Sequence, residues 1–411
     1  MSAGLSHVRV CDLSGQLAGA GATKILAAFG AQVIRVEDPL THGLWDILRG
    51  AGPFVDDRRG INMGGAFNNH NVGKQGVTIN LRTEAGKYLL RELIGVSDVV
   101  TENFSSGVLA RLGFGYEEMR RVNPEIIYVS NSGFGQHGPY KRFKTWGPIV
   151  QAMSGLTFSS GLPDEEPAGW GYSYMDHVAA YYMTVAVLAA LHHRERTGSG
   201  QCVDLSSVPA GIAMLPTEVL DWTVNGRAGR MPNRPGGNRA DFDEMAPHGI
   251  YPCSGEDRWI AIACRDDAEF RRLGKVLDEP GLAAREFSTL QQRLAAVSEI
   301  DRLIGDRSRT RDADSLARDL VGAGVPASVV KRPRERIDED PEMKAWGMFP
   351  AVTHKEIGEV RVEGLPLRMS ASPWTMSAGA PCLGEHNREI FGGLLGHSAE
   401  ELAEWTRLGV I

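Results

Sequence analysis

Cysteine is scarce in this chain, and its distribution excludes a disulfide framework. The 411 residues include five cysteines, an odd number, scattered from Cys11 to Cys382. Disulfide-stabilised secreted domains carry closely spaced cysteines, so this usage is typical of reduced thiols in a cytoplasmic protein. A CxxC or HExxH motif is also missing. The sequence therefore gives no support for a dedicated metal site.

Long apolar runs and an excess of positive charge are missing as well. No apolar stretch approaches the length that spans a bilayer, and residues 1–7 lack the regions of a signal peptide. The chain carries 44 Lys and Arg against 51 Asp and Glu, which gives a net charge of −7. Nucleic-acid-binding proteins show the opposite, a basic face. We therefore expect a cytoplasmic protein with neither a membrane nor a nucleic acid among its partners.

Strands and helices alternate along the first half of the chain. Residues 8–13 predict a buried strand, 14–21 a loop of small residues, 22–29 a helix and 32–37 the next strand. Such a unit implies a parallel sheet with a right-handed crossover. Further strands are expected at 77–80, 99–101, 126–130 and 201–205, with helices at 84–93, 107–112 and 178–191. The pattern predicts a Rossmann-like open α/β sheet that binds ligands at the carboxyl ends of its strands.

The composition changes after residue 225, where Asn, Gly, Arg and Pro cluster. Residues 248–253 and 259–264 predict a β-hairpin, and helices over 267–276 and 316–321 and a strand over 327–330 follow. The tail predicts a last helix over 399–408. We predict a large α/β domain over 1–210, a linker over 211–225 and a small α+β domain over 226–335. Residues 336–411 are expected to link back to the large domain and complete it.

A glycine-containing turn near the N-terminus suggests a dinucleotide site, but one position disagrees. In the run GAGATK of residues 19–24, Lys24 stands where the fingerprint has its third glycine. A Rossmann NAD site is therefore disfavoured. Contact with a phosphate and close packing of a helix on a strand both explain the small residues.

One acidic side chain stands between an aromatic, glycine-punctuated loop and the long apolar helix. The run GWGYSYMDH of residues 169–177 places Asp176 in the first turn of that helix. Free N–H groups and the helix macrodipole favour negative charge there. The Asp176 carboxylate is therefore either a helix cap or a nucleophile held ready, and the residues themselves leave both open.

Motifs along nearly the whole chain occur in a specific order. They are the strand-loop-helix-strand of 10–37, LRTEAG (81–86), ENF (102–104), LARLGF (109–114), NPEIIY (123–128), GFG (133–135), GPY (138–140), the Asp176 segment, RTGSGQ (196–201) and LGEHN (383–387). With this set the chain resembles the class III CoA-transferases, the formyl-CoA and carnitine CoA-transferase group. The resemblance implies an enzyme that moves CoA from an acyl-CoA to an acceptor carboxylic acid. Asp176 matches the family's nucleophile, which forms an aspartyl-acyl anhydride and then an aspartyl-CoA thioester.

The resemblance also assigns residues to the substrates. Coenzyme A, a substrate and not a permanently bound cofactor, is expected to contact Lys74, Asn103, Phe104, Arg111, Lys144 and Ala18. Trp170 and Tyr172 are candidates for the acid pocket. Gly236 and Gly237 match the start of a glycine-rich loop that closes over the nucleophile in the family. Here the segment continues as ADFDEMAP and not as a run of glycines, which puts that closure in doubt.

Two further features bear on specificity and assembly. Leu17 occupies a position where formyl-CoA enzymes carry Gln, which argues against formate or oxalate as the natural acid. By resemblance, two subunits interlock as rings in a homodimer. The sequence does not identify the donor or the acceptor acid.

Two other functions compete with transfer. An α-methylacyl-CoA racemase or epimerase of the same superfamily needs a His and Asp pair. Its His would fall near Trp146, and no His occurs between Gly138 and His177. A CoA-binding protein without catalysis is the third hypothesis, and Asp176 in its full motif argues against it.

Overall fold

The computed structural model describes residues 3–161, 165–169, 171–227 and 245–411, which divide into two compact units. The first unit comprises Met1–Thr157, Gly169–Leu220 and Pro341–Ile411, and the second comprises Phe158–Ala168 and Asp221–Asp340. The C-terminal segment therefore returns to the first unit. The small domain predicted over 226–335 lies within the second unit.

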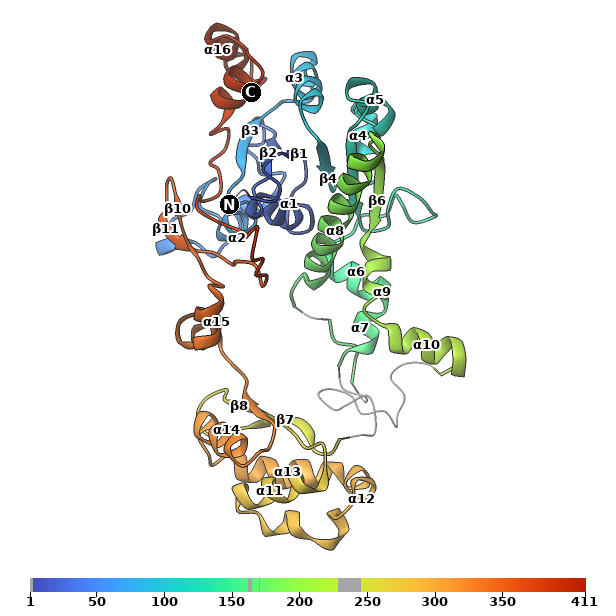
Figure 1. Ribbon diagram of the computed structural model, residues 1–411, viewed down its shortest axis with the longest axis vertical. Helices are drawn as coiled ribbons and strands as arrows, with labels where there is room; N and C mark the ends of the chain where they lie inside the picture. Colours follow the sequence, from blue (N-terminus) through green and yellow to red (C-terminus); the bar gives the residue numbers. More distant parts are fainter. Residues whose placement is uncertain (1–2, 162–164, 170, 228–244) are drawn as a thin grey trace. The chain divides into compact units, whose positions relative to one another are not determined.

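The first unit is built on a six-stranded parallel sheet in the order β3-β2-β1-β4-β5-β6 (Figure 1). The strands are β1 (Arg9–Asp12), β2 (Gln32–Glu37), β3 (Gln75–Thr78), β4 (Val99–Glu102), β5 (Ile127–Ser132) and β6 (Cys202–Ser206). All neighbouring strands pair in parallel. The strand order reverses between β1 and β4, which is where open α/β sheets bind their ligands. The predicted α/β fold class is confirmed.

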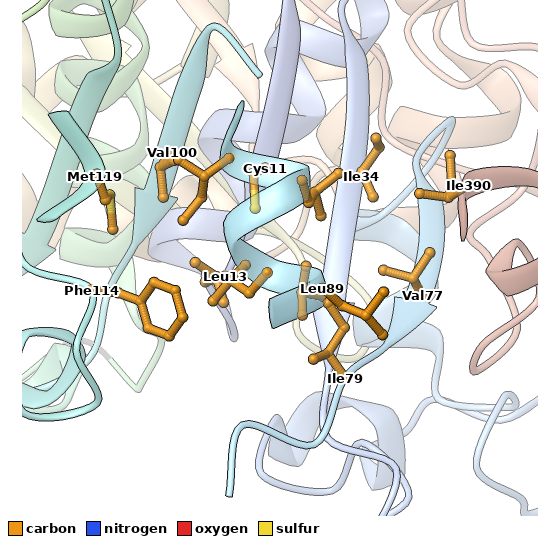
Figure 2. Close-up of a cluster of buried hydrophobic side chains, with 14 of the residues drawn as sticks. Cys11, Leu13, Ile34, Val77, Ile79, Leu89, Val100, Phe114, Met119 and Ile390 are labelled. Atoms are coloured by element: carbon orange, nitrogen blue, oxygen red, sulfur yellow. The ribbon is translucent and has the colours of Figure 1, made fainter. Parts of the chain in front are cut away.

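Helices cover both faces of this sheet, because successive strand residues point to opposite sides. On one face, Cys11, Ile34 and Val100 belong to a core that α3 (Glu84–Gly95), α5 (Tyr116–Val122) and the π-helix Arg388–Leu394 complete. Figure 2 shows this core, with Leu89 of α3 among the side chains of the strands. On the other face, Val10 and Val33 pack with α1 (Ala18–Ala28) and α8 (Tyr174–Thr197).

Helix α1 begins at Ala18, four residues before the predicted helix over 22–29, so the predicted loop over 14–21 is too long. Tight packing explains its small residues. A Cβ atom on Gly19 would lie 2.2 Å from the Cβ atom of Ser14, and one on Gly21 would lie 3.2 Å from that of Ala180 in α8. The close-packing interpretation of the glycines is therefore favoured over a dinucleotide fingerprint.

Helix α8 corrects the prediction that no apolar run is long enough to span a bilayer. By length and composition it is the single helix among the described residues that could do so, with 24 residues. Half of its most apolar stretch is buried inside the protein. Buried core helices of globular proteins pass the same test, so the helix is weak evidence for a membrane span.

The other elements, apart from those that form the core of the second unit, are short. They are two 3₁₀ turns (Ile47–Gly50 and Val55–Asp57), α2 (Gly65–His70), α4 (Val108–Arg111), α6 (Gly147–Ser154), α7 (Leu156–Ser159), α9 (Ser207–Ile212), α10 (Pro216–Asn225), the π-helix Glu335–Glu339, α15 (Pro341–Trp346), the antiparallel pair β10 (Ala351–His354) and β11 (Gly358–Arg361), and α16 (Ala399–Arg407).

The second unit is an α+β structure with its own core. Its antiparallel sheet has the order β7-β8-β9, from β7 (His248–Pro252), β8 (Trp259–Ala263) and β9 (Ala327–Val329). Strands β7 and β8 form the predicted hairpin. Ile260 and Ile262 of β8 pack with apolar side chains of α11 (Asp267–Leu277), α13 (Val297–Ser308) and α14 (Ala313–Gly322). Helix α12 (Leu290–Ala295) and the 3₁₀ turns Pro280–Ala283 and Arg285–Phe287 complete the unit.

Candidate active site

A cavity of about 320 Å³ opens at the carboxyl ends of β1, β4, β5 and β6, where the strand order reverses. Its wall comes from the β1–α1 loop, the segment after β4, the segment after β5, α6 and the first turn of α8. The lining residues are Gly15, Gln16, Ala18, Trp45, Asn103, Phe104, Ser105, Ser106, Asn131, Ser132, Gly133, Lys141, Phe143, Lys144, Thr145, Trp146, Val150, Asp176 and Ser207. Four predicted CoA contacts thus meet the predicted nucleophile: Ala18, Asn103, Phe104 and Lys144.

The β1–α1 loop is fixed from below by Asp12, the last residue of β1. The Asp12 carboxylate accepts hydrogen bonds from the Ser14 hydroxyl, from Thr23 Oγ1 at 2.7 Å and from Thr101 Oγ1 at 3.0 Å. Burial by itself would raise the pKa of Asp12, but Lys74, Arg35 and the hydroxyls of Ser14 and Thr23 together hold it below its usual value. A charged Asp12 therefore anchors the loop that carries Gly15 and Gln16 and leads into Ala18 at the start of α1.

Lys74 is part of this anchor and does not line the cavity. Its side chain is fully buried, and its Nζ lies 3.2 Å from Asp12 Oδ2, 2.7 Å from Thr23 Oγ1 and 2.9 Å from Asn71 Oδ1. Burial lowers the pKa of Lys74 to about 8, against the opposing charge of Asp12. The ammonium is committed to protein oxygens, so contact with a CoA phosphate would require it to give up these bonds. The structure thus gives Lys74 a supporting position beneath the site.

Asn103 joins the two sides of the reversal point. Its Oδ1 accepts from the Gly15 N–H at 2.7 Å, and its Nδ2 donates to the Gly15 carbonyl at 2.8 Å. One side-chain amide therefore pairs with both backbone groups of Gly15, as a neighbouring strand would. Asn103 lines the cavity, but both polar atoms of its amide are already hydrogen-bonded to Gly15 of the β1–α1 loop.

Phe104 and Trp45 separate this cavity from a smaller one of about 200 Å³. Their ring centroids lie 5.4 Å apart, and both residues line both cavities. The smaller cavity is mostly apolar, with Ile79 and Leu81 in its wall, and Arg82 and Asp38 also line it. The tertiary structure thus places a second, mostly apolar cavity beside the main one, with charged residues in its lining, and the two cavities share the wall formed by Trp45 and Phe104.

The positive charges near the cavity differ in position. Lys141 and Lys144 are exposed and line it. Arg111, in α4, is exposed as well, but it is not among the lining residues, and its Nη1 lies 3.5 Å from the Ser106 carbonyl. The predicted contact between Arg111 and CoA stays a prediction.

Asp176 lies in the first turn of α8, as predicted, and faces the cavity. The cap of that helix is Ser173, which makes no side-chain capping bond. Burial raises the pKa of Asp176 to about 6, against a lowering hydrogen bond with Ser173. Near neutral pH the site therefore presents a poorly solvated carboxylate, which is a stronger nucleophile than a carboxylate in water.

His177 follows Asp176 but is directed elsewhere. Its ring stacks on Tyr172, with centroids 5.1 Å apart, and its Nε2 lies 2.6 Å from the Tyr172 hydroxyl. It lines a separate cavity of about 40 Å³ together with His70. Among the described residues that line the main cavity there is no histidine, and Trp146 is one of these lining residues. The geometry gives no His–Asp pair at Asp176, which weakens the racemase alternative.

The remaining predicted positions divide into two groups. Tyr172 is 57% exposed and does not line the main cavity. Trp170, Gly236 and Gly237 lie outside the described residues. The acid pocket and the closing loop therefore stay predictions.

Several lining residues were missed by the sequence analysis. Asn131 and Ser132 end β5, and their place at the carboxyl end of a parallel strand was a usable signal. The Ser132 hydroxyl is buried and has no hydrogen-bond partner in the described part of the chain. Gln16, with φ of 55°, and Trp45 carried no local signal.

Known proteins with the same features identify the family. The sequence profile of CoA-transferase family III matches residues 5–387. The chain belongs to CoA-transferase family III. It is 35% identical to the succinyl-CoA–D-citramalate CoA-transferase of Chloroflexus aurantiacus over 405 residues, 97% of this chain and 96% of that protein. It is 32% identical to the formyl-CoA:oxalate CoA-transferase of Streptomyces coelicolor over 99% of both chains.

A solved structure gives the same result for the fold. The CAIB/BAIF family protein from Brucella suis matches with a TM-score of 0.87 and 30% identity, over 96% of this chain and 100% of that one. The protein is therefore a family III CoA-transferase, an enzyme of EC 2.8.3 type that moves CoA between an acyl-CoA and an acid. The described residues contain no group of His, Cys, Asp and Glu that could hold a metal ion.

Proposed function

We propose that this family III CoA-transferase works by covalent catalysis at Asp176. The Asp176 carboxylate attacks the thioester carbonyl of the acyl-CoA and expels CoA thiolate, which leaves an aspartyl-acyl anhydride. The thiolate then attacks the aspartyl carbonyl of that anhydride and releases the donor carboxylate, giving an aspartyl-CoA thioester. The acceptor carboxylate repeats these two steps in reverse and leaves with CoA, while Asp176 is regenerated. Splitting one hard exchange into easier displacements is the advantage of a nucleophile.

The observation that carries this proposal is the position of Asp176. It is the one carboxylate among the described lining residues, and burial raises its pKa to about 6. The N–H groups in the first turn of α1, beginning at Ala18, and the unpartnered Ser132 hydroxyl are donors suited to the oxyanions that form during each attack.

The cavities suit the parts of an acyl-CoA. Lys141 and Lys144 provide ammonium groups for phosphates. The smaller, mostly apolar cavity beside Phe104 and Trp45, with Arg82 in its lining, suits the planar adenine. On this assignment Asn103 and Lys74 act mainly by shaping the β1–α1 loop.

The proposed acids are small dicarboxylic acids. The names of the two relatives contain two dicarboxylates, D-citramalate and oxalate, and succinyl-CoA, the thioester of a third dicarboxylic acid. Leu17 argues against oxalate itself, so succinyl-CoA is the first donor to try. A screen of acyl-CoA donors against mono- and dicarboxylic acids of equal carbon number tests this, and faster turnover of the monocarboxylates would contradict it.

Chemical trapping tests the nucleophile. Incubation with an active acyl-CoA donor and hydroxylamine, followed by peptide mass analysis, is expected to convert Asp176 to its hydroxamate. Asp176→Ala should lose CoA exchange by at least about a thousandfold, since the covalent route is removed. The matched control is Asp306→Ala, an exposed aspartate of α13. An unmodified Asp176 under turnover, or an Asp176→Ala protein with normal exchange, would refute the mechanism.

We further propose a cytoplasmic, interlocked homodimer. Tyr181, Val185 and Leu188 of α8 are 52%, 64% and 42% exposed. Their spacing places them on one face of α8, as an apolar stripe that a second subunit would cover. Sedimentation at nanomolar concentration should show a dimer that resists dilution, and Val185→Asp should prevent its assembly. Val321→Asp, at a valine of α14 that is 58% exposed, is the control. A stable wild-type monomer would contradict the proposal.

A further inference from the structure

Six of the lining residues lie in one irregular segment, residues 133–146, which follows β5. They are Gly133, Lys141, Phe143, Lys144, Thr145 and Trp146, yet no helix or strand forms between residues 133 and 146. Rings of the segment contact one another, with centroids of Phe134 and Tyr140 5.6 Å apart. Side-chain contacts, and not the hydrogen bonds of a helix or strand, must therefore fix the position of this part of the cavity wall.

The side chain of Gln136 connects this segment to the opposite wall. Its Oε1 accepts from Ser106 Oγ at 2.8 Å and from the Gly107 N–H at 3.0 Å. Its Nε2 donates to Ser130 Oγ, in β5, at 2.7 Å. Ser106 lines the cavity and Gln136 does not. One amide thus joins the segment after β4, the body of β5 and the 133–146 segment.

Two residues behind the lining, Ser130 and Glu102, extend this connection toward Phe104. Glu102 is buried, and burial raises its pKa. Ser130, which accepts from Gln136, lies close enough to Glu102 to lower this pKa in part. Glu102 Oε2 accepts from the Phe104 N–H at 2.7 Å and its Oε1 accepts from the Tyr128 hydroxyl at 2.9 Å. Glu102 therefore holds Phe104 and Gln136 holds Ser106, and Ser130 lies between these two polar side chains, which influence each other.

The backbone of Gln136 is itself fixed. Its N–H lies 2.9 Å from both carboxylate oxygens of Asp204 in β6, and His137 Nδ1 lies 2.8 Å from Asp204 Oδ2. The preceding Gly135 has φ of 73°, a conformation that side chains rarely adopt. Gln136 is thus held at its backbone by β6 and at its amide by β5 and the segment after β4.

We propose that Gln136 is a positioning residue for CoA binding. It sets the distance between the wall of residues 103–107 and the wall of residues 141–146, and so aligns Phe104 with Lys144 before the substrate arrives. Fixing both walls in advance lowers the ordering cost of binding. The inference rests on the proposed assignment of this cavity to CoA. Because Gln136 does not line the cavity, its effect should appear in acyl-CoA affinity and not in the chemical step.

Steady-state kinetics of Gln136→Met test this, since Met keeps the length and removes both polar ends. KM for acyl-CoA should rise about tenfold, and kcat should stay within about twofold. Hydrogen exchange of residues 138–146 should become faster in the variant. The matched control is Gln32→Met at the start of β2. Gln32 also makes two side-chain hydrogen bonds, to Arg9 and Gln75, and the KM of this control should be unchanged.

Gln136→Glu provides a readout that a merely structural role would not move. A protonated Glu can replace the amide, whereas an ionised Glu cannot donate to Ser130 and adds a second negative charge to a residue whose backbone N–H is already bound to the Asp204 carboxylate. The ratio of its Kd for free CoA to that of the wild type, measured by calorimetry, should therefore shrink from pH 8.5 to pH 5.5. For Gln136→Met the ratio should not change with pH.

Two results would overturn the inference. One is a Gln136→Met protein with reduced kcat and unchanged KM. The other is a rise in KM of the same size in Gln32→Met. Lys144→Ala tests the assignment of this cavity to CoA separately from the role of Gln136. If Lys144→Ala leaves KM for acyl-CoA unchanged, the cavity is not the CoA site, and the role of Gln136 falls with it.

Discussion

Replacing Asp176 with Asn should make the ligand-free protein more stable at pH 8, because the native fold holds this carboxylate in a poorly solvated place. Burial raises the pKa of Asp176 from 3.8 to about 6. That difference corresponds to about 3 kcal/mol of unfolding free energy when the group is fully ionised. The carboxylate also gains roughly 0.5 kcal/mol from the N-terminus of α8. We expect a net gain of about 2 to 3 kcal/mol in the Asn variant.

The sign of the pH dependence follows from proton binding. Between pH 3.8 and about 6 the folded state holds the Asp176 proton more tightly than the unfolded state does. The wild type therefore loses stability as the pH rises through this window, and the loss is complete above about pH 6. The amide of the Asn variant carries no charge, so Asp176→Asn should match the wild type near pH 4 and exceed it at pH 8.

Urea unfolding at pH 4, 6 and 8 measures this difference, and a thermal melt at pH 8 should show a shift of roughly 3 °C. The control is Asp306→Asn, because the Asp306 side chain is 59% exposed and its charge stays hydrated. Equal stability of Asp176→Asn and wild type at all three pH values would refute the desolvated carboxylate. So would a loss of stability at pH 8.

Three further outcomes follow from the same contacts. The acid limb of kcat/KM should fall near pH 6, because Asp176 must be ionised to attack, and a limb near pH 4 would contradict a raised pKa. Lys74→Met should cost about 3 to 5 kcal/mol in urea unfolding, because it leaves the buried Asp12 without its ion-pair partner, whereas Lys87→Met, in a partly exposed helix pair with Glu84, should cost less than about 1; equal costs would refute the buried pair. Gly19→Ala should cost about 1 to 3 kcal/mol, because its Cβ would overlap Ser14, while Gly322→Ala meets nothing within 4 Å and should be neutral or stabilising; a neutral Gly19→Ala would show that α1 can shift.

Local pattern was enough for much of the fold. The strand over 32–37, the β7–β8 hairpin and the place of Asp176 in a first helical turn agree with the structure, because periodicity, turn residues and helix starts depend on neighbours in sequence. The start of α1 was placed four residues late. Gly19 in its first turn packs closely against Ser14 and against Asn103, and Asn103 follows β4, far beyond the local pattern.

The candidate site divides in the same way. The motifs around Asp176 predict a nucleophile there, and the carboxyl ends of the strands predict the place of the cavity that Asp176 lines. The burial of Lys74 against Asp12, 62 residues earlier, depends on β1 and β3 lying on either side of β2. The pairing of Asn103 with Gly15 depends on the contact of β1 with β4.

Side-chain type and spacing along the chain were enough to establish the kinds of elements, their order and the residue predicted to carry the chemistry. The tertiary structure decided which polar groups line the cavity and which make the hydrogen bonds that hold its walls in place. Strand order makes that choice, because it brings together groups too far apart in sequence for any local pattern to connect. Gln136 and Lys74 show it most clearly, since both lie beside the cavity and neither reaches into it.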